Sequence, residues 1–212
     1  EFTEPEIQRA GLVGVVLEML ALGLGDPESF PFVDAPPRRL IAEAWSSLVE
    51  LQAVDDQRRL TAIGRRLARL PVDARQGRML IEAAQRGALG DVLVLVAALS
   101  IADVRERPLD QQQAADQAHA EFAVPGSDFL TVLRLWKWWQ KTRSDLSRNQ
   151  ADKQARKRFL NAQRLHEWGQ LHAQLLGLAR EEGWKPGKPG QAEPDVVHRS
   201  LLSGLLAMIG QH

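Results

Sequence analysis

The segment LTAIGRRLARLPVDARQGRMLIEA, residues Leu60–Ala83, decides how the chain is organised. Thr61 is placed to cap a short basic helix over residues 62–70, because its hydroxyl can accept from the free N–H groups of a first turn. Pro71 ends that helix, and a second basic helix is expected over residues 73–86. The segment therefore predicts two basic helices joined by a very short connection, which is unlike an ordinary catalytic site.

On both sides of this segment, hydrophobic residues recur at helical spacing. The stretch over residues 90–102 is apolar on nearly all sides, so we expect it at the centre of a helical bundle. Further helices are expected over residues 5–22, 36–51, 110–122, 128–142, within 149–182, and over 195–209. Residues 58–61 are a candidate wing strand, and the proline- and glycine-rich residues 183–194 predict a flexible loop. The predicted fold class is all-α, with at most a small β-wing.

Composition places the chain among globular proteins. Its 212 residues are 44% hydrophobic and 25% charged, and this length predicts one large or two small domains. It has no cysteine, which excludes disulfides and thiolate chemistry and fits the reducing cytoplasm, where we expect the protein. No apolar run approaches the roughly 20 residues of a membrane span, and the first residues do not resemble a signal peptide. We therefore expect no membrane association.

Charge is balanced overall but uneven along the chain. Residues 131–170 carry ten basic and three acidic side chains, whereas residues 1–60 carry five basic and eleven acidic ones. Neutral overall charge argues against a protein that coats nucleic acid, but local basic segments can still supply phosphate contacts. The alternative is that these segments are ordinary solvated helix faces.

Motifs for catalysis are missing from the sequence. There is no GxxxxGK[ST] loop for a triphosphate, no GxGxxG, no HExxH and no GxSxG. The five histidines are scattered, and His166 and His172 are six residues apart, unlike the i, i+4 pair that binds a metal on one helix face. We therefore predict no catalytic, metal or cofactor site, and no ATPase site, within this chain.

The segment LRLWKWWQKTR, residues Leu133–Arg143, combines tryptophan with basic residues, as single-strand-binding surfaces do. Helical spacing puts Leu135, Trp136 and Trp139 on one face, which favours a packing role for these three side chains. The candidates for an exposed binding face are Arg134, Lys137, Trp138 and Lys141. The following segment ARKRFLNAQR adds the basic residues Arg156, Lys157, Arg158 and Arg164.

A winged helix is the second fold that the pattern allows. Residues 40–51, a turn, the candidate wing and the basic helix after it would suit that fold, which often reads duplex DNA through its second helix. Here the second helix, IAEAWSSLVEL, is neutral to acidic and has no Arg, Asn or Gln to reach base edges. A structural winged helix is therefore favoured, while a DNA-binding regulator and a protein-interaction scaffold stay open as alternatives.

Several stretches resemble, in order, the C-terminal region of DEAH-box RNA helicases. They are residues Thr3–Asp26, Phe30–Leu51, Leu60–Ala83, Val92–Pro108, Ser127–Trp136 and Phe159–Trp168. The RERP loop and the closing LLSGLLAMIG are most similar to the bacterial HrpA type. The chain has SDFL where eukaryotic relatives usually have GDHL.

The resemblance implies a winged-helix domain over residues 1–72 and a ratchet-like helical bundle over residues 73–212, packed together at Pro71-Val72-Asp73. In that family two RecA-like domains, which use ATP and Mg²⁺, come first, and an OB-fold follows. The chain would then be an accessory part of an ATP-dependent 3′-to-5′ RNA helicase. Its partners would be single-stranded RNA and the RecA-like and OB-fold domains of the same parent.

The resemblance also implies where RNA would lie. The ratchet forms one wall of a single-stranded RNA channel opposite the RecA-like domains, and this role falls here on residues 105–113 and 127–141. The RNA-contact candidates in these segments are Arg105, Arg107, Gln112, Arg134 and Lys137. Trp138, Lys141, Arg156 and Arg158 complete the set of candidates.

Overall fold

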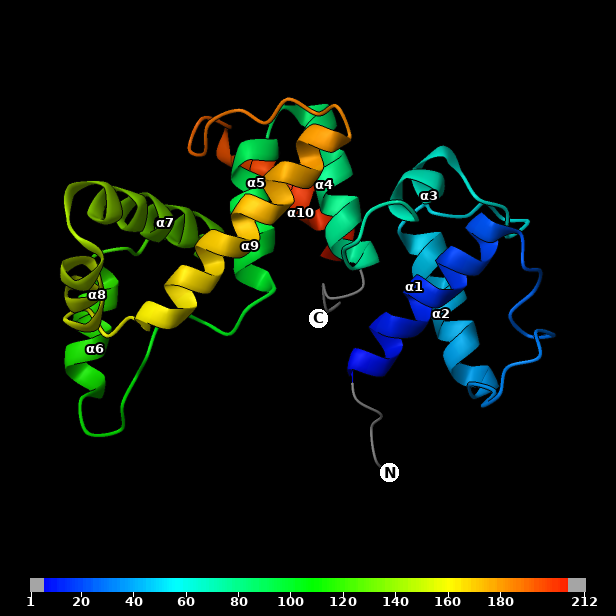
Figure 1. The fold of residues 1–212 in the computed structure, drawn as a ribbon, viewed down its shortest axis with the longest axis horizontal. Helices are drawn as coiled ribbons and strands as arrows, with labels where there is room; N and C mark the ends of the chain where they lie inside the picture. Colours follow the sequence, from blue (N-terminus) through cyan, green and yellow to red (C-terminus); the bar gives the residue numbers. More distant parts are fainter. Residues whose placement is uncertain (1–5, 206–212) are drawn as a thin grey trace. The chain divides into compact units, whose positions relative to one another are not determined.

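The computed structural model describes residues 6–205, with side chains from residue 11 onward, and this part of the chain is helical (Figure 1). The described residues contain isolated bridge pairs but no β-strand, which confirms the predicted all-α fold. By their contacts they form two compact units, residues 6–82 with 199–205, and residues 83–198. No helix within residues 6–205 combines the length and apolarity needed to cross a membrane.

The first unit is built on two packed helices, α1 (Glu6–Leu22) and α2 (Arg38–Glu50). The side chains that α2 buries recur every three or four residues, which places them on one face: Leu40, Ile41, Ala44, Trp45 and Leu48. From α1, Val16, Leu17 and Met19 are buried. The helix expected over residues 36–51 is therefore present, with its recurring apolar residues on the buried face.

The predicted wing strand over residues 58–61 is wrong, because only one bridge pair forms, between Val54 and Leu60. The Asp55 carboxylate accepts hydrogen bonds from the backbone N–H groups of Gln57 and Arg59, both at 2.9 Å. These bonds hold the chain in a tight turn, so the residues that a longer strand would need are part of the turn instead.

Two further helices complete the decisive segment: α3 (Ala62–Leu67) and α4 (Ala74–Arg86). The Thr61 hydroxyl accepts from the Gly64 N–H at 3.0 Å, which confirms the predicted cap. Gly64 is required here, because a Cβ at this position would lie 2.0 Å from the carbonyl oxygen of Ala53. The helix ends at Leu67 rather than residue 70, because the chain turns before Pro71.

The last helix of the described residues, α10 (Pro194–Leu205), ends within the first unit. Arg75 of α4 donates to the Gly204 carbonyl at 3.3 Å, and Ser203 donates to the Arg78 carbonyl at 3.4 Å. A Cβ on Gly204 would lie 2.4 Å from the Arg75 carbonyl oxygen, so the two backbones pack closely. The boundaries of these compact units therefore differ from the predicted domain boundary between residues 72 and 73. Compact units are defined by contacts alone, so the domain boundary itself stays a prediction.

The second unit packs around α5 (Leu89–Leu99), which is buried at every residue from Leu89 to Ala97. α7 (Asp128–Asp145) and α9 (Ala162–Glu181) both contact it. The Trp168 indole of α9 donates to the Val94 carbonyl at 2.9 Å, which fixes α9 on the central helix. The predicted central position of this apolar segment is confirmed.

The long helix expected within residues 149–182 is present as α9, but it begins only at Ala162. The shorter helix α8 (Arg148–Arg156) precedes it, and Phe159, at a φ of 53°, lies between the two. The backbone of this break pairs with a distant segment, because Asn161 donates to the Val104 carbonyl at 2.7 Å. The Asn161 side chain then caps α9 by accepting from the Arg164 N–H at 3.0 Å. Phe159 and Leu160 consequently lie outside any helical stripe.

The proline- and glycine-rich loop before α10 follows an irregular course, as the sequence predicts. It is nevertheless attached to α5, because the buried Asp91 carboxylate accepts from the N–H groups of Gly190 and Ala192. A Cβ on Gly90 would lie 2.3 Å from the Gly187 carbonyl oxygen. The loop predicted as flexible is thus held by specific backbone contacts at its middle.

Candidate nucleic-acid interface

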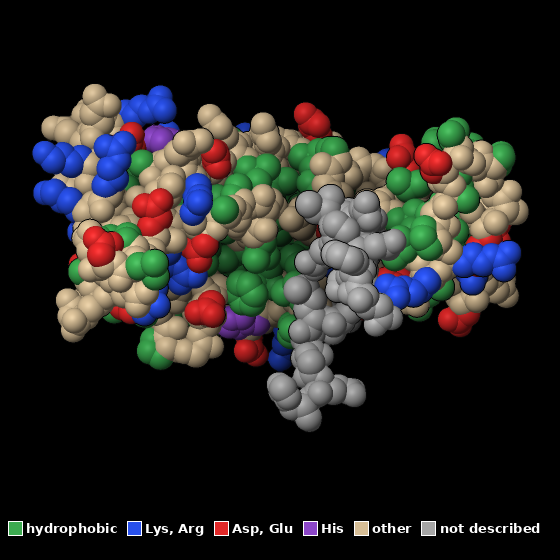
Figure 2. All heavy atoms as spheres, turned by 90° about the horizontal axis from the view of Figure 1, so that it is seen from below, with side chains coloured by type: hydrophobic (Ala, Val, Ile, Leu, Met, Phe, Trp, Pro, Cys, Tyr) green, Lys and Arg blue, Asp and Glu red, His purple; other side chains and the backbone are tan. Residues whose placement is uncertain are grey.

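The nine candidate residues all lie in the second unit, on the segment before α6, on α6 (Gln112–Ala120), on α7, and on α8 or, for Arg158, just after it. These three helices gather at one end of the unit (Figure 1). Figure 2 shows Lys and Arg side chains clustered over that end of the second unit. The structure therefore brings the sequence candidates into one region, although their individual surroundings differ.

One side of α7 is buried and the other carries basic residues. Trp136 and Trp139 are 5% and 0% exposed, which confirms their predicted packing role. Arg134, Lys137 and Lys141 are exposed, and their spacing of three and four residues puts them on one helix face. Among the described residues, no carboxylate pairs with Lys137 or Lys141, so their ammonium groups are open to an anionic ligand. The Arg134 guanidinium donates to the Ala123 carbonyl at 2.8 Å.

Trp138 is half-buried, so the prediction that it contributes to an exposed face needs correction. Its ring meets the edge of Phe122 at a centroid distance of 5.4 Å. The Arg158 guanidinium covers one ring face at 5.1 Å. Arg158 is itself held by Glu121 at 3.2 Å and by Gln154 at 3.3 Å. The tryptophan that the sequence suggested for base stacking therefore packs against the protein's own side chains.

The basic residues of α8 stand on a well-anchored helix. Ser147 and Gln150 form a capping box at its start, and Ala151 and Ala155 are fully buried. Its exposed cations are Arg148, Lys153, Arg156 and, just past its end, Lys157. Arg156 therefore projects from a fixed backbone and has no carboxylate partner among the described residues.

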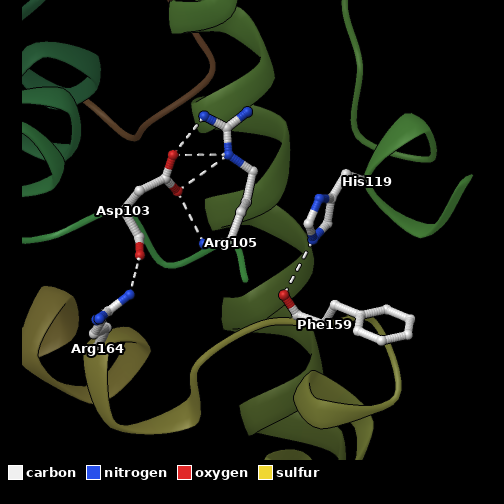
Figure 3. Close-up of polar contacts among 5 residues, drawn as sticks. All are labelled: Asp103, Arg105, His119, Phe159 and Arg164. Atoms are coloured by element: carbon white, nitrogen blue, oxygen red, sulfur yellow. Dashed lines mark hydrogen bonds and ion pairs between the residues drawn. The ribbon is translucent and has the colours of Figure 1, made fainter. Parts of the chain in front are cut away.

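Arg105 is tied to a neighbouring carboxylate (Figure 3). Its Nε and Nη2 atoms donate to Asp103 at 3.1 and 2.7 Å, and its backbone N–H adds a bond of 2.9 Å. Partial burial opposes ionisation of Asp103, but these hydrogen bonds outweigh it and lower the pKa of the carboxyl group. Arg164 donates to the Asp103 carbonyl at 2.7 Å, which links this segment to α9.

Arg107 is also paired, because its Nε and Nη2 atoms each lie 2.7 Å from the Asp116 carboxylate. The hydrogen bonds from Arg107 lower the pKa of Asp116. Both side chains are exposed, and such surface ion pairs contribute little to stability because solvent screens them. Gln112 opens α6 one turn before Asp116, so it lies on the same helix face as this ion pair.

An apolar pocket of about 310 Å³ lies beside Arg105 in the second unit. The C-terminal end of α5, the segment after it and the first turns of α7 form its walls, and Trp168 of α9 contributes to its lining. Sequence reasoning missed this pocket. The local signal in the sequence was that two apolar residues, Leu99 and Ile101, stand directly before a charged loop.

The four histidines within residues 6–205 make separate contacts rather than forming a shared site. His166 binds Asp152 at 2.8 Å, His198 binds Ser127 at 2.7 Å, and His119 binds the Phe159 carbonyl at 3.1 Å (Figure 3). Burial beside Trp136 lowers the pKa of His172. Within the described part of the chain, no three His, Cys, Asp or Glu residues are grouped to hold a metal ion.

Two domain families match this chain. Residues 44–72 match the winged-helix helicase-associated domain, HA2, and residues 73–132 match its ratchet-like domain. The all-helical fold agrees with both assignments. The class that fold and sequence define is thus a helicase-associated region.

Sequence comparison with individual proteins shows which members of this class the chain resembles. The chain is 44% identical to the ATP-dependent RNA helicase HrpA homolog of Haemophilus influenzae and 43% identical to ATP-dependent RNA helicase HrpA of Escherichia coli, over 99% of its length in each case. It is 32% identical to the pre-mRNA-splicing factor ATP-dependent RNA helicase prp22 of Schizosaccharomyces pombe over 98% of its length. The chain belongs to the helicase-associated family of DEAH-box RNA helicases, and within it to the HrpA type.

The match covers only a small part of these relatives. The chain spans 17%, 16% and 17% of the lengths of the three proteins, respectively. The helicase-associated domains define a role that is accessory to a helicase.

Proposed function

We propose that this chain is the accessory nucleic-acid-binding region of an ATP-dependent 3′-to-5′ RNA helicase, and that its second unit contacts single-stranded RNA. The observation that carries the proposal is the set of exposed cations on α7 and α8 that have no carboxylate partner among the described residues, above all Lys137, Lys141 and Arg156. Cations that are free of intramolecular partners can neutralise phosphates without first breaking an ion pair.

In the complete protein, this surface would line the single-stranded RNA channel opposite the RecA-like domains, and an OB-fold would follow. Arg105, Arg107, Gln112, Arg134 and Arg158 stay candidates for RNA contact. For Arg105, Arg107 and Arg158, however, contact through the atoms now bound to carboxylates would require exchange of one anion for another. Their contribution to affinity is expected to be smaller than that of Lys137 or Lys141.

ATP and Mg²⁺ would be bound by the parent's RecA-like domains, since this sequence has no loop suited to a triphosphate. The pure chain should therefore hydrolyse no ATP, with or without RNA, and measurable turnover by it would contradict the assignment. Action in the cytoplasm is proposed for the parent, in keeping with a chain that has no cysteine.

The direct test is fluorescence anisotropy of labelled single-stranded RNA titrated with the chain at low and moderate salt. Combined reversal of Lys137, Lys141 and Arg156 to Glu should weaken binding at least about tenfold and flatten its salt dependence. The matched control reverses Arg180, Lys185 and Lys188 to Glu, three exposed cations of the same unit, so that net charge changes equally.

The outcomes separate the alternatives. Loss of binding in the first variant with little change in the control supports an RNA surface on α7 and α8. Equal loss in both variants would show general charge attraction and would contradict the assigned surface. Preference for duplex DNA would favour the DNA-binding regulator, and no nucleic-acid binding at low salt would favour an interaction scaffold.

A further inference from the structure

The pocket beside Arg105 is a slot with apolar walls that opens to solvent. Leu135 and Trp168 are buried within it, whereas Leu99 at its edge is 50% exposed. Phe129, from the first turn of α7, is half-buried and presents an aromatic ring to the same space. At about 310 Å³ the slot is at the lower end of the range for small-ligand sites, which suits a single flat ring system.

The lining also includes two polar groups of opposite charge. Arg105 is held in place by Asp103 through Nε and Nη2, so Nη1 is the terminal nitrogen not bound to that carboxylate (Figure 3). Asp128, at the start of α7, is exposed, lines the same pocket and interacts electrostatically with Arg105, whose pKa its negative charge helps to raise. Because Asp103 fixes the orientation of Arg105, little side-chain freedom is lost when an anion binds there.

We propose that this pocket receives one unstacked nucleobase of a single-stranded RNA, with Arg105 facing the attached phosphate and Asp128 accepting from an amino group of the base. The inference rests on the proposed function for the presence of the strand. Unpaired bases are recognised by aromatic stacking and by hydrogen bonds to their edges. Phe129 and the apolar walls supply the first interaction, and the Asp128 carboxylate supplies the second.

The charge pattern favours a nucleotide over a peptide. A peptide that inserts an apolar side chain beside a lysine would satisfy Asp128 but would place no anion beside Nη1 of Arg105, the terminal nitrogen that Asp103 does not bind. A nucleotide presents both complements, because its phosphate is negative and its base carries N–H donors. An acceptor-only carboxylate further favours cytosine, adenine and guanine, which have exocyclic amino groups, over uracil, which has none.

The test uses cytidine 5′-monophosphate and uridine 5′-monophosphate as separate probes of the whole chain, followed by backbone amide shifts in NMR spectra. Cytidine monophosphate should shift the amides of residues 99–105 and 127–132, and uridine monophosphate should bind about tenfold more weakly. Asp128→Asn should remove this difference, and Phe129→Ala should weaken both nucleotides. Leu109→Ala, at an exposed apolar position outside the pocket, is the matched control.

Equal binding of the two nucleotides, or shifts confined to other residues, would overturn the inference. So would a response of the same amides to an apolar-basic peptide but to neither nucleotide. Salt-sensitive RNA binding that persists without any response at the pocket would sink the nucleobase site and leave the proposed function intact. Nucleotide binding at the pocket without RNA binding would instead contradict the proposed function, and with it the inference that the pocket receives a base of an RNA strand.

Discussion

The candidate cations of the second unit each carry one positive charge, but they differ in whether that charge is available to a phosphate. Arg105 and Arg107 each bind a carboxylate through two guanidinium nitrogens. Lys137, Lys141 and Arg156 are exposed and have no such partner within the described residues. A local count of basic residues therefore overestimates the charge that a surface offers to phosphate, because neighbouring carboxylates of the same protein already neutralise part of it.

The largest effect is expected from the buried side chain that supports the free cations. Trp139→Ala would leave a cavity beneath α7, since Trp139 is 0% exposed, and should lower the free energy of unfolding by about 3–5 kcal/mol. Urea denaturation followed by circular dichroism measures this change. Lys137→Ala, on the opposite face of the helix, should alter stability by less than about 0.5 kcal/mol. Similar losses in the two variants would contradict the two-sided description of α7.

The second prediction converts a neutralised cation into a free one. Asp116→Asn removes the carboxylate that binds Arg107, so the released guanidinium becomes available and RNA binding should tighten about threefold at low salt. Anisotropy titration measures the gain, and its disappearance at high salt would confirm an electrostatic origin. In the double variant Asp116→Asn with Arg107→Ala the gain should be lost; a gain that survives there would point to another cause.

A smaller difference should separate single deletions from the two groups. Lys137→Ala should weaken RNA binding severalfold and lower the slope of log affinity against log salt by about 0.7, the value for one phosphate contact to a single strand. Arg107→Ala should change affinity by less than about twofold, because Asp116 already neutralises this guanidinium. The change also frees the Asp116 carboxylate, but this group is exposed and solvent screens its repulsion of the strand. A larger loss for Arg107→Ala than for Lys137→Ala would reverse the comparison.

The smallest effect concerns pH and His172. Burial lowers its folded-state pKa below the ordinary value, so the unfolded chain binds a proton more readily. Its contribution to stability is therefore complete above the ordinary pKa of the imidazole and is lost as pH falls toward the folded-state value. NMR titration of the ring should show a midpoint below 6.5, the usual histidine value, and His172→Asn should reduce the loss of stability in acid. A midpoint at or above the usual value would show that burial does not govern this side chain.

Local features of the fold followed directly from the sequence. Thr61 caps the helix that it precedes, as predicted, because a cap depends only on residues three positions away. The burial of Trp136 and Trp139 followed from helical spacing alone. The family and the all-α fold were also evident, because several ordered stretches carry the resemblance.

The features that sequence reasoning missed depend on contacts between distant residues. The break between α8 and α9 forms because Asn161 pairs with Val104, 57 positions earlier in the numbering, and no local pattern announces it. Glu121 binds Arg158 over 37 positions, which decides how much of Trp138 is covered. The pocket is likewise assembled from α5, α7 and α9. Candidate cations could be named from the sequence, but which of them are free could not.

The return of α10 to α4 has a consequence for synthesis of the protein. Arg75 and Gly204 meet across 129 positions, so the first unit is interrupted in the sequence by the whole of the second. A ribosome adding about 5–20 residues per second completes residues 6–82 on the order of ten seconds before residues 199–205 emerge. The second unit is continuous and can fold during that interval, whereas the unit that begins first is finished last. Truncation after residue 198 should therefore damage the N-terminal unit most.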